Sequence, residues 1–313
     1  MAALFHQELE WGERKLLAAM RKPTKSKLRE WMMSYLFLLP ALAFFVVFVV
    51  YPMLRGIYMS FFDYNITSFE FIGLENYVTL YHDKTFIKSL INTIVLVAVA
   101  VPVVIGFSIF VAMSIYKKSE FIRSLCRGIF YLPAVTSVVS VTIVWGWIHH
   151  PNFGLLNYIT GLFGIEPISW LGDPKTALMA ITVILITTSV GQPIILYVAS
   201  LGNIPTTYIE AAQIDRATPW QIFRKIIWPL LMPTSLYVIV ITTINSFQCF
   251  ALIQLLTAGG PIYSTQTVMY GVYQQAFLLG NFGIASAMGV ILAIIIGIIS
   301  IIQFKYLGND VEY

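Results

Sequence analysis

Six long apolar segments dominate the sequence and limit what the chain can fold into. They cover residues 31–53, 89–116, 128–148, 176–201, 229–257 and 282–304. Each is about as long as the 20 or so apolar residues that a helix needs to cross the hydrocarbon core of a bilayer. Segments that cross lipid must bond their backbone polar groups within the protein, which helices achieve. We therefore expect an all-α membrane protein with six transmembrane helices.

The composition supports this class independently. Of the 313 residues, 58% are hydrophobic and only 11% are charged, whereas an ordinary soluble domain has about 25% charged residues. A soluble fold of this size could not bury so much apolar surface. The two cysteines, Cys126 and Cys249, fall at or inside apolar segments, so neither a disulfide framework nor a metal site is expected.

Basic residues are distributed unequally between the two sides of the predicted membrane domain. If the N-terminus is cytoplasmic, fifteen lysines and arginines fall on that side and four on the other. The positive-inside rule then predicts that both termini are cytoplasmic. The expected organisation is a basic tail over residues 1–30, a membrane domain over 31–304 and a C-terminal tail over 305–313. Within the first tail, residues 4–20 space their apolar side chains for a helix lying on the membrane surface.

The stretch 208–229 is the only long polar interruption in the second half of the chain. Its pattern predicts two short helices. The first covers about 205–215 and carries Ile209, Ala212 and Ile214 on its apolar side. Thr218-Pro219 predicts a capped restart, because proline is favoured at the first helical position, and an amphipathic helix follows over 220–228. A plain solvated loop would be shorter and less patterned, so this stretch is interpreted as a partner-binding element.

The same stretch resembles the EAA loop of binding-protein-dependent ABC importer permeases, whose pattern is EAA-x3-G-x9-I-x-L-P. Glu210-Ala211-Ala212 is followed at the family's spacing by Ile226 and Pro229, and Asp215 and Ala217 also match. The chain departs from the pattern twice, with Arg216 in place of the glycine and Trp228 in place of the leucine.

Three further stretches resemble sugar permeases in sequence order. They are 71–77 followed by Asn92-Thr93, then 131–157, and then the LT-x-GGP-like 255–261. Together they narrow the resemblance to the maltose-type (MalF-like) branch of carbohydrate importers. The resemblance implies a type I ABC importer permease fold, with a cytoplasmic EAA coupling loop over 202–228, in a bacterial or archaeal cell membrane.

The resemblance also implies partners. These are a second homologous permease, a pair of ATPase subunits that bind ATP and Mg, and an extracellular solute-binding protein that delivers the sugar. The chain lacks the GxxxxGK[ST] phosphate-binding loop, so it is expected to be a transport subunit with no cofactor of its own and not an enzyme. Nothing indicates nucleic-acid binding.

The resemblance assigns ATPase coupling to one group of residues. They are Glu210, Ala211, Ala212, Asp215, Arg216 and Ala217. Glu210 is expected to pair with a basic residue of the ATPase, and Asp215 to help set the fold of the loop. Two roles stay open for Arg216: pairing with Asp215 or Glu210 where the family has its turn glycine, or reaching an acidic group on the ATPase.

The polar residues inside the apolar segments are neutral, and no segment has an ionisable residue near its centre. Hydroxyls and amides among aromatic residues suit a neutral sugar, although hydrogen bonding between helices is the simpler explanation for any single serine or threonine. The resemblance places sugar contacts in the segments before and after the coupling loop. The predicted substrate-path residues are Thr188, Ser189, Gln192, Thr242, Asn245, Ser246 and Gln248.

Two alternatives to a sugar permease remain open. A permease of the same architecture for glycerol phosphate, a peptide or a metal would predict basic residues or ligand clusters along the path. An ion channel or ion-coupled secondary transporter would predict intramembrane charge or internal repeats with broken helices. The latter class would also have no use for the EAA-like stretch.

Overall fold

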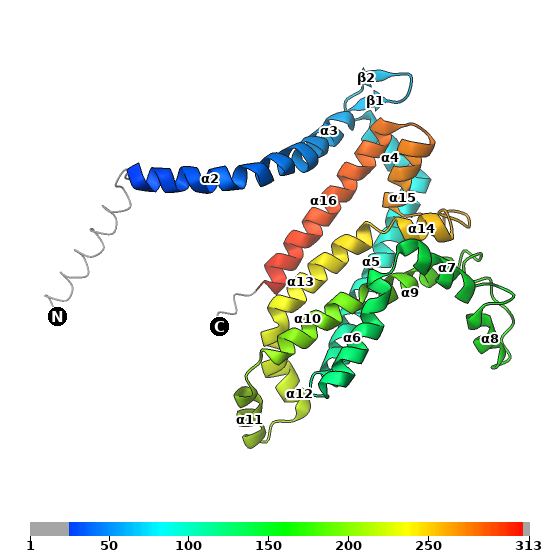
Figure 1. Cartoon of the computed structure of the whole chain (residues 1–313). Coiled ribbons are helices and arrows are strands. Elements are labelled where there is room, and N and C mark those ends of the chain that lie inside the picture. Colours follow the sequence, from blue (N-terminus) through cyan, green and yellow to red (C-terminus); the bar gives the residue numbers. More distant parts are fainter. Residues whose placement is uncertain (1–24, 309–313) are drawn as a thin grey trace. The chain divides into compact units, whose positions relative to one another are not determined.

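The computed structural model of the chain describes residues 25–308, which are almost entirely helical (Figure 1). The predicted surface helix at 4–20 and the end of the C-terminal tail, 309–313, lie outside the described residues. The chain divides into two units, Met1–Arg55 and Gly56–Tyr313.

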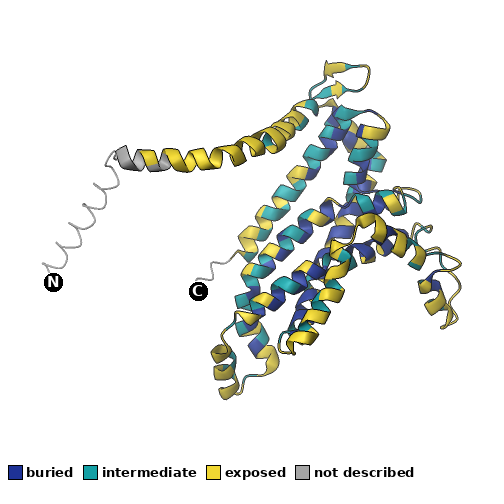
Figure 2. Cartoon of the chain, in the orientation of Figure 1, coloured by how far each residue is buried: buried dark blue, intermediate teal, exposed yellow. Residues whose placement is uncertain are grey.

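From residue 25 onward, the N-terminal unit is one long helix with a mainly apolar sequence. It is built from α2 (Lys25–Phe45), a π-helical segment (Val46–Val50) and the beginning of α3 (Tyr51–Met59). The apolar run Met32–Met59 has 28 residues, enough to cross a bilayer. Residues 32–49 are all exposed (Figure 2). This is expected of a helix whose neighbours are lipid tails or another protein chain.

The second unit contains the five other membrane segments. Their elements are α5 (Lys84–Ile115), α6 (Glu120–Val135), α7 (Val138–Ile148), α9 (Ala177–Ser189), α10 (Gly191–Gly202), α12 (Pro219–Ile222), a π-helical segment (Phe223–Ile227), α13 (Trp228–Phe247) and α16 (Phe282–Leu307). Two pairs are bent: α6 and α7 by 101°, and α9 and α10 by 42°. Counting each bent pair as one segment gives the six membrane segments that the sequence predicts.

The predicted membrane segments 128–148 and 229–257 are interrupted by breaks in the helical backbone. The segment 128–148 turns through 101° between α6 and α7, because Thr136 and Ser137 adopt extended backbone after Pro133. The segment 229–257 is helical only as far as Phe247, and its remainder forms the separate short helix α14 (Ala251–Leu256). Hydrophobicity sets the length of an apolar run, but it does not reveal where the backbone breaks within the run.

Helix α5 forms the centre of the second unit and contacts α9, α10 and α13. A buried apolar cluster that includes Val104, Ile194, Tyr197 and Leu231 joins α5 to α10 and α13. Helix α10 also approaches α6 closely at Gly191. A Cβ atom there would lie 2.5 Å from the carbonyl oxygen of Phe130, so only glycine permits this contact.

At one end of the second unit a hairpin packs against α4 and α16. It consists of β1 (Phe62–Tyr64) and β2 (Phe69–Phe71), which pair antiparallel, and it is followed by α4 (Glu75–His82). The Nδ2 atom of buried Asn76 donates to the carbonyl oxygens of Ser60 and Phe62, at 2.9 Å each. The 71–77 stretch thus holds the hairpin in place.

Two other sequence motifs meet at the same end of the molecule. Asn92 on α5 donates from Nδ2 to the carbonyl oxygens of Tyr263 and Gln266, at 2.9 Å each. The Thr93 hydroxyl accepts from the N–H of Val268, at 3.0 Å, where α15 (Val268–Tyr273) begins. Residues far apart in sequence therefore fix the loop that follows the LT-x-GGP-like stretch.

Asn157 organises the third motif. It lies in α8 (Leu155–Gly161) and donates from Nδ2 to the carbonyl oxygens of Pro151 and Ile168, at 2.8 Å each. Its Oδ1 accepts from the N–H of Ile168, at 3.2 Å, and from Nε1 of Trp170, at 2.8 Å. The side-chain amide thereby uses both its donors and its acceptor to close the loop between α7 and α9.

We predict that Gly191→Ala lowers the free energy of unfolding of the detergent-purified protein by about 2 kcal/mol, and lowers its melting temperature accordingly. The reason is that the added methyl group must push α10 away from α6. Gly202→Ala is the matched control, since it lies in the same helix and its Cβ would meet nothing within 4 Å. Equal melting temperatures for the two variants would contradict the close contact.

Candidate functional site

A cavity of about 420 Å³ lies where the broken helices meet. Its walls come from the end of α6, the α9–α10 junction, α13 and the start of α14. Six of the seven predicted substrate-path residues line it. These are Thr188, Ser189, Gln192, Thr242, Asn245 and Gln248.

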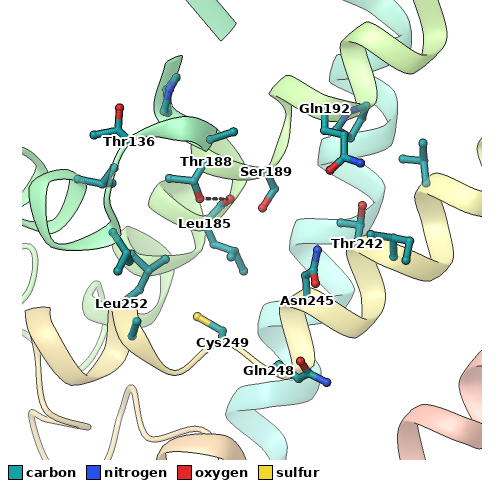
Figure 3. A pocket seen from close by; sticks show the side chains of 18 of the residues that line it. Thr136, Leu185, Thr188, Ser189, Gln192, Thr242, Asn245, Gln248, Cys249 and Leu252 are labelled. Carbon is teal, nitrogen blue, oxygen red and sulfur yellow. Dashed lines mark hydrogen bonds between the residues drawn. The ribbon is translucent and has the colours of Figure 1, made fainter. Parts of the chain in front are cut away.

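Figure 3 shows how the bends bring these side chains together. Ser189 ends α9 and Gln192 lies in the first turn of α10, and both face Thr242 and Asn245 of α13 across the cavity. The seventh predicted residue, Ser246, is 1% exposed and does not line the cavity.

Three side-chain amides on the cavity wall have unused hydrogen-bonding capacity. Among the described residues, none is hydrogen-bonded to the side chains of Gln192, Asn245 or Gln248, and all three are exposed. Each amide has two N–H donors and an oxygen with two lone pairs. Thr188 differs, because its hydroxyl already donates to the carbonyl oxygen of Leu185, at 2.9 Å. The amides are therefore the groups best placed to bond a polar ligand.

The cavity carries no formal charge, since no Asp, Glu, Lys, Arg or His is among its lining residues. Its wall also includes the aromatic side chains of Tyr237 and Phe250 and the hydroxyl of Thr136. The predicted path residues did not include these three. Tyr237 precedes Asn245 by eight residues, which places both on one helix face, and this spacing could have identified it. A neutral wall of amides, hydroxyls and aromatic rings suits a polyhydroxylated ligand.

The second candidate site is the loop between α10 and α13. It begins with α11 (Thr206–Ile214). The predicted restart at Thr218-Pro219 is confirmed: the Thr218 hydroxyl accepts from the N–H of Gln221, at 3.3 Å, and Gln221 Oε1 accepts from the N–H of Thr218, at 2.7 Å. This reciprocal capping box starts a helix that continues to Phe247. The loop is thus part of the same helix that lines the cavity.

The buried face of the loop agrees with the prediction except at one residue. Ile209 and Ala212 pack against the buried apolar cluster, as does Trp228, which stands where the family pattern has leucine. The prediction for Ile214 is wrong, because its side chain is 82% exposed. Five residues after Ile209, it lies about 140° further around the helix, away from the core.

Arg216 occupies a left-handed backbone conformation with φ of 56°. Its N–H donates to the carbonyl oxygen of Gln213, at 3.0 Å, and the N–H of Ala217 donates to that of Ala212, at 2.9 Å. These two bonds form a Schellman motif, in which glycine is the usual residue at the left-handed position. This left-handed turn explains why the family pattern has glycine at the position of Arg216. A non-glycine residue in the left-handed conformation costs about 1–2 kcal/mol.

The six predicted coupling residues lie together around this turn. Glu210, Ala211, Asp215 and Arg216 are exposed, and Ala212 and Ala217 are half-buried. In the part of the chain that the structure describes, the salt bridges join Glu120 to Arg123 and Arg127. No ion pair there joins Arg216 to Asp215 or Glu210, so the structure gives no support to the first of its two predicted roles.

The protein has several membrane helices that surround a polar cavity. Its exposed loop continues directly into a helix that lines this cavity. This is the architecture of a transport permease. Residues 78–313 match the family described as the binding-protein-dependent transport system inner membrane component. The chain belongs to this family.

Curated relatives match over most of their length. A probable ABC transporter permease of Pyrococcus horikoshii is 34% identical over 88% of this chain and 96% of its own. A probable starch degradation products transport system permease, AmyD, of Thermoanaerobacterium thermosulfurigenes is 33% identical over 86% and 91%. The lactose transport system permease LacF of Rhizobium radiobacter is 30% identical over 87% and 92%.

Solved structures show the same fold. A chain of a bacterial ABC transporter involved in the import of the acidic polysaccharide alginate superimposes with a TM-score of 0.79. It is 25% identical and covers 92% of this chain and 99% of its own length. A second structure, of an alginate ABC transporter in complex with an alginate pentasaccharide-bound periplasmic protein, gives a TM-score of 0.78 at 26% identity, over 90% and 95%. The six-segment type I permease fold predicted from the sequence is confirmed.

We predict that Arg216→Gly slows amide exchange at Ala217 by about fivefold, because glycine removes roughly 1 kcal/mol of backbone cost from the Schellman turn. Arg216→Val is expected to speed exchange at the same amide, since a β-branched residue tolerates a positive φ least. Hydrogen exchange with mass spectrometry measures both, with Arg224→Gln as the control. Unchanged exchange in both Arg216 variants would contradict the assignment.

Proposed function

We propose that this chain is the permease subunit of an ATP-driven importer and forms half of the path for a sugar or oligosaccharide. The observation that carries the proposal is the cavity with its three unpartnered amides and no charged side chain. Relatives named for lactose and for starch degradation products support a carbohydrate cargo. A phosphorylated or acidic cargo is disfavoured, because no lysine or arginine lines the cavity.

The other half of the path comes from a second, homologous permease. Gln192, Asn245 and Gln248 line the cavity and are exposed in the single chain. A second subunit would close this open side and exclude water from the sugar. The periplasmic protein in the related alginate transporter structure supports a solute-binding protein as the partner that delivers the cargo.

The energy source is a separate pair of ATPase subunits that bind ATP and Mg. They dock on α11, where exposed Glu210 pairs with a basic residue of the ATPase. The continuous helix Pro219–Phe247 then carries displacement of the loop to Thr242 and Asn245 in the cavity. This requires the coupling loop and both termini to be cytoplasmic, as the distribution of basic residues predicts.

The decisive experiment measures ATPase activity of the complete transporter in lipid, with a panel of sugar-loaded binding proteins. Stimulation by one loaded binding protein supports an importer and names its cargo. Stimulation only by a binding protein loaded with a non-sugar solute would overturn the carbohydrate assignment. Failure of any ATPase to co-purify would overturn the importer itself.

We predict that Gln192→Leu and Asn245→Leu each lower uptake at subsaturating sugar by about fivefold, since a neutral hydrogen bond contributes about 1 kcal/mol. Uptake into proteoliposomes measures the effect. Ser246→Ala is the matched control, because the Ser246 hydroxyl is buried, lies away from the cavity and has no hydrogen-bond partner among the described residues. If a variant that carries both Gln192→Leu and Asn245→Leu still takes up sugar at the wild-type rate, these two amides are not part of the path.

We predict that Glu210→Lys abolishes ATP-driven uptake while leaving membrane insertion intact, because it places like charges at the ATPase contact. Gln213→Lys introduces the same lysine side chain at another exposed position of α11 without removing a carboxylate, and it should leave uptake largely unchanged. Uptake and membrane insertion are measured in the same cells. Normal uptake with Lys at position 210 would remove Glu210 from the coupling contact.

A further inference from the structure

A smaller polar pocket lies where the start of α5 meets α15 and the π-helical segment Gln274–Leu278. Its volume is about 170 Å³, more than ten times the roughly 10–15 Å³ that one water molecule needs. It shares no lining residue with the central cavity. Its polar wall includes Asp83, Gln266, Gln274 and Gln275, and we call it the α5 pocket.

Asp83 is the one charged side chain among the described residues that line the α5 pocket. It caps the N-terminus of α5, where its Oδ1 accepts from the N–H of Thr85, at 2.8 Å. The salt bridges of the described residues do not include it, and no described residue donates to its second oxygen. The pocket therefore presents a half-buried carboxylate that can still accept hydrogen bonds.

Three glutamine side chains add amide groups to the same wall. Gln266 is only 4% exposed, and its Nε2 donates to Oε1 of Gln274, at 3.0 Å. Oε1 of Gln275 accepts from Nδ2 of Asn281, at 3.1 Å. These bonds occupy the oxygens of Gln274 and Gln275 but leave the N–H donors of both amides without a partner among the described residues. The pocket thus offers donors and an acceptor together.

This combination selects one class of ligand. A sugar unit carries adjacent hydroxyls that each donate and accept, so it can use the carboxylate and the amides at once. A calcium ion would need six to eight oxygen ligands, whereas the wall presents amide nitrogens and a single carboxylate. An anion would be repelled by Asp83. Phe86 and Tyr263 add aromatic rings to the wall, which is typical of sites for small organic ligands.

We propose that the α5 pocket binds one sugar unit at a site separate from the central cavity. Asp83 accepts hydrogen bonds from the sugar hydroxyls, and the amides of Gln274 and Gln275 donate to them. The inference rests on the proposed function, since it takes the same class of cargo. The pocket lies at the end of the second unit opposite α11 (Figure 1). In the proposed importer this is the extracellular side.

The test measures binding of radiolabelled sugars to the complete transporter in lipid nanodiscs, without the binding protein. The probes are maltotriose, lactose and any sugar that stimulates the ATPase in the assay above. Binding is measured in wild type and in the variant with both Gln192→Leu and Asn245→Leu, which lacks two amides of the central cavity. Sugar binding that remains in this variant reports the α5 pocket.

Asp83→Ser is the informative substitution, made in the variant with the altered cavity. Serine caps a helix about as well as aspartate but lacks the second carboxylate oxygen. The remaining sugar binding should weaken about tenfold, because a hydrogen bond to a charged group is stronger than a neutral one. Asp173→Ser is the matched control. Asp173 Oδ1 also accepts from the N–H two residues later, that of Lys175, at 2.9 Å, but Asp173 lines neither pocket. It should change affinity less than twofold.

Gln275→Glu separates a sugar from a cation as the ligand. It keeps an oxygen that accepts from Asn281 and replaces the amide donor by a second carboxylate oxygen. Sugar binding should weaken about fivefold, since a donor to the sugar is lost. Binding of radiolabelled calcium is measured in parallel. Unchanged sugar affinity together with tighter calcium binding would overturn the sugar assignment in favour of a cation.

Two further outcomes overturn the inference. The first is wild-type sugar affinity in Asp83→Ser with an unchanged melting temperature. The second is loss of all sugar binding when the two cavity amides are replaced, because sugar would then bind only in the central cavity. If wild type binds no sugar and no sugar-loaded binding protein stimulates the ATPase, the proposed function has itself failed. The wild-type measurements therefore distinguish the two kinds of failure.

Discussion

The organisation of this protein depends on where its helices are interrupted inside an apolar environment. A helix can break at membrane depth only where neighbouring groups satisfy or cover the freed backbone. At the α9–α10 break, the buried hydroxyl of Ser108 on α5 donates to the carbonyl oxygen of Val190, at 3.4 Å. Gly191 lets α6 pack directly against the break. At the α6–α7 break, the Thr136 hydroxyl donates to the carbonyl oxygen of Leu132, at 2.7 Å.

These interruptions also create the cavity. They place Thr136, Ser189 and Gln192 at or next to helix ends, where the side chains point into the space between segments. A straight bundle of the same sequence would distribute these polar groups along separate helices. The cavity instead collects amides and hydroxyls from elements distant in the chain, with no formal charge among them. This is the chemistry expected for binding a neutral, hydroxyl-rich solute and then releasing it.

The loop and the cavity are connected by one uninterrupted helix. It begins at the Thr218 capping box and runs to Phe247. The distance from Pro219 to Thr242 is about 35 Å at 1.5 Å per helical residue. Ile209 and Ala212 anchor the start of the loop to the buried apolar cluster, so the loop and the cavity wall belong to one mechanical unit. In the proposed importer, the continuous helix transmits the movement caused by ATP hydrolysis in another subunit to the cavity that holds the sugar.

The sequence alone determined the class of fold, because the length of apolar runs depends only on composition along the chain. It also determined the capped restart at Thr218, since capping is an interaction between residues three apart. The EAA-like spacing identified the family for the same reason: its residues share one short loop. Six of the predicted path residues line the cavity, and the resemblance placed them by their spacing from the coupling loop, which is a local property of the chain.

Tertiary structure decided the rest. The 101° bend between α6 and α7 depends on which neighbours each helix meets. The neighbouring residues Asn245 and Ser246 lie on different sides of α13, and of these two only Asn245 lines the cavity. The hydrogen bonds from Asn92 to Tyr263 and Gln266 join residues more than 170 positions apart, a distance at which sequence pattern carries no information. The left-handed backbone conformation of Arg216 cannot be predicted from the residue type, because arginine rarely adopts a positive φ. Local chemistry thus fixed the elements and the family, and packing between distant elements fixed the cavity and the surface offered to a partner.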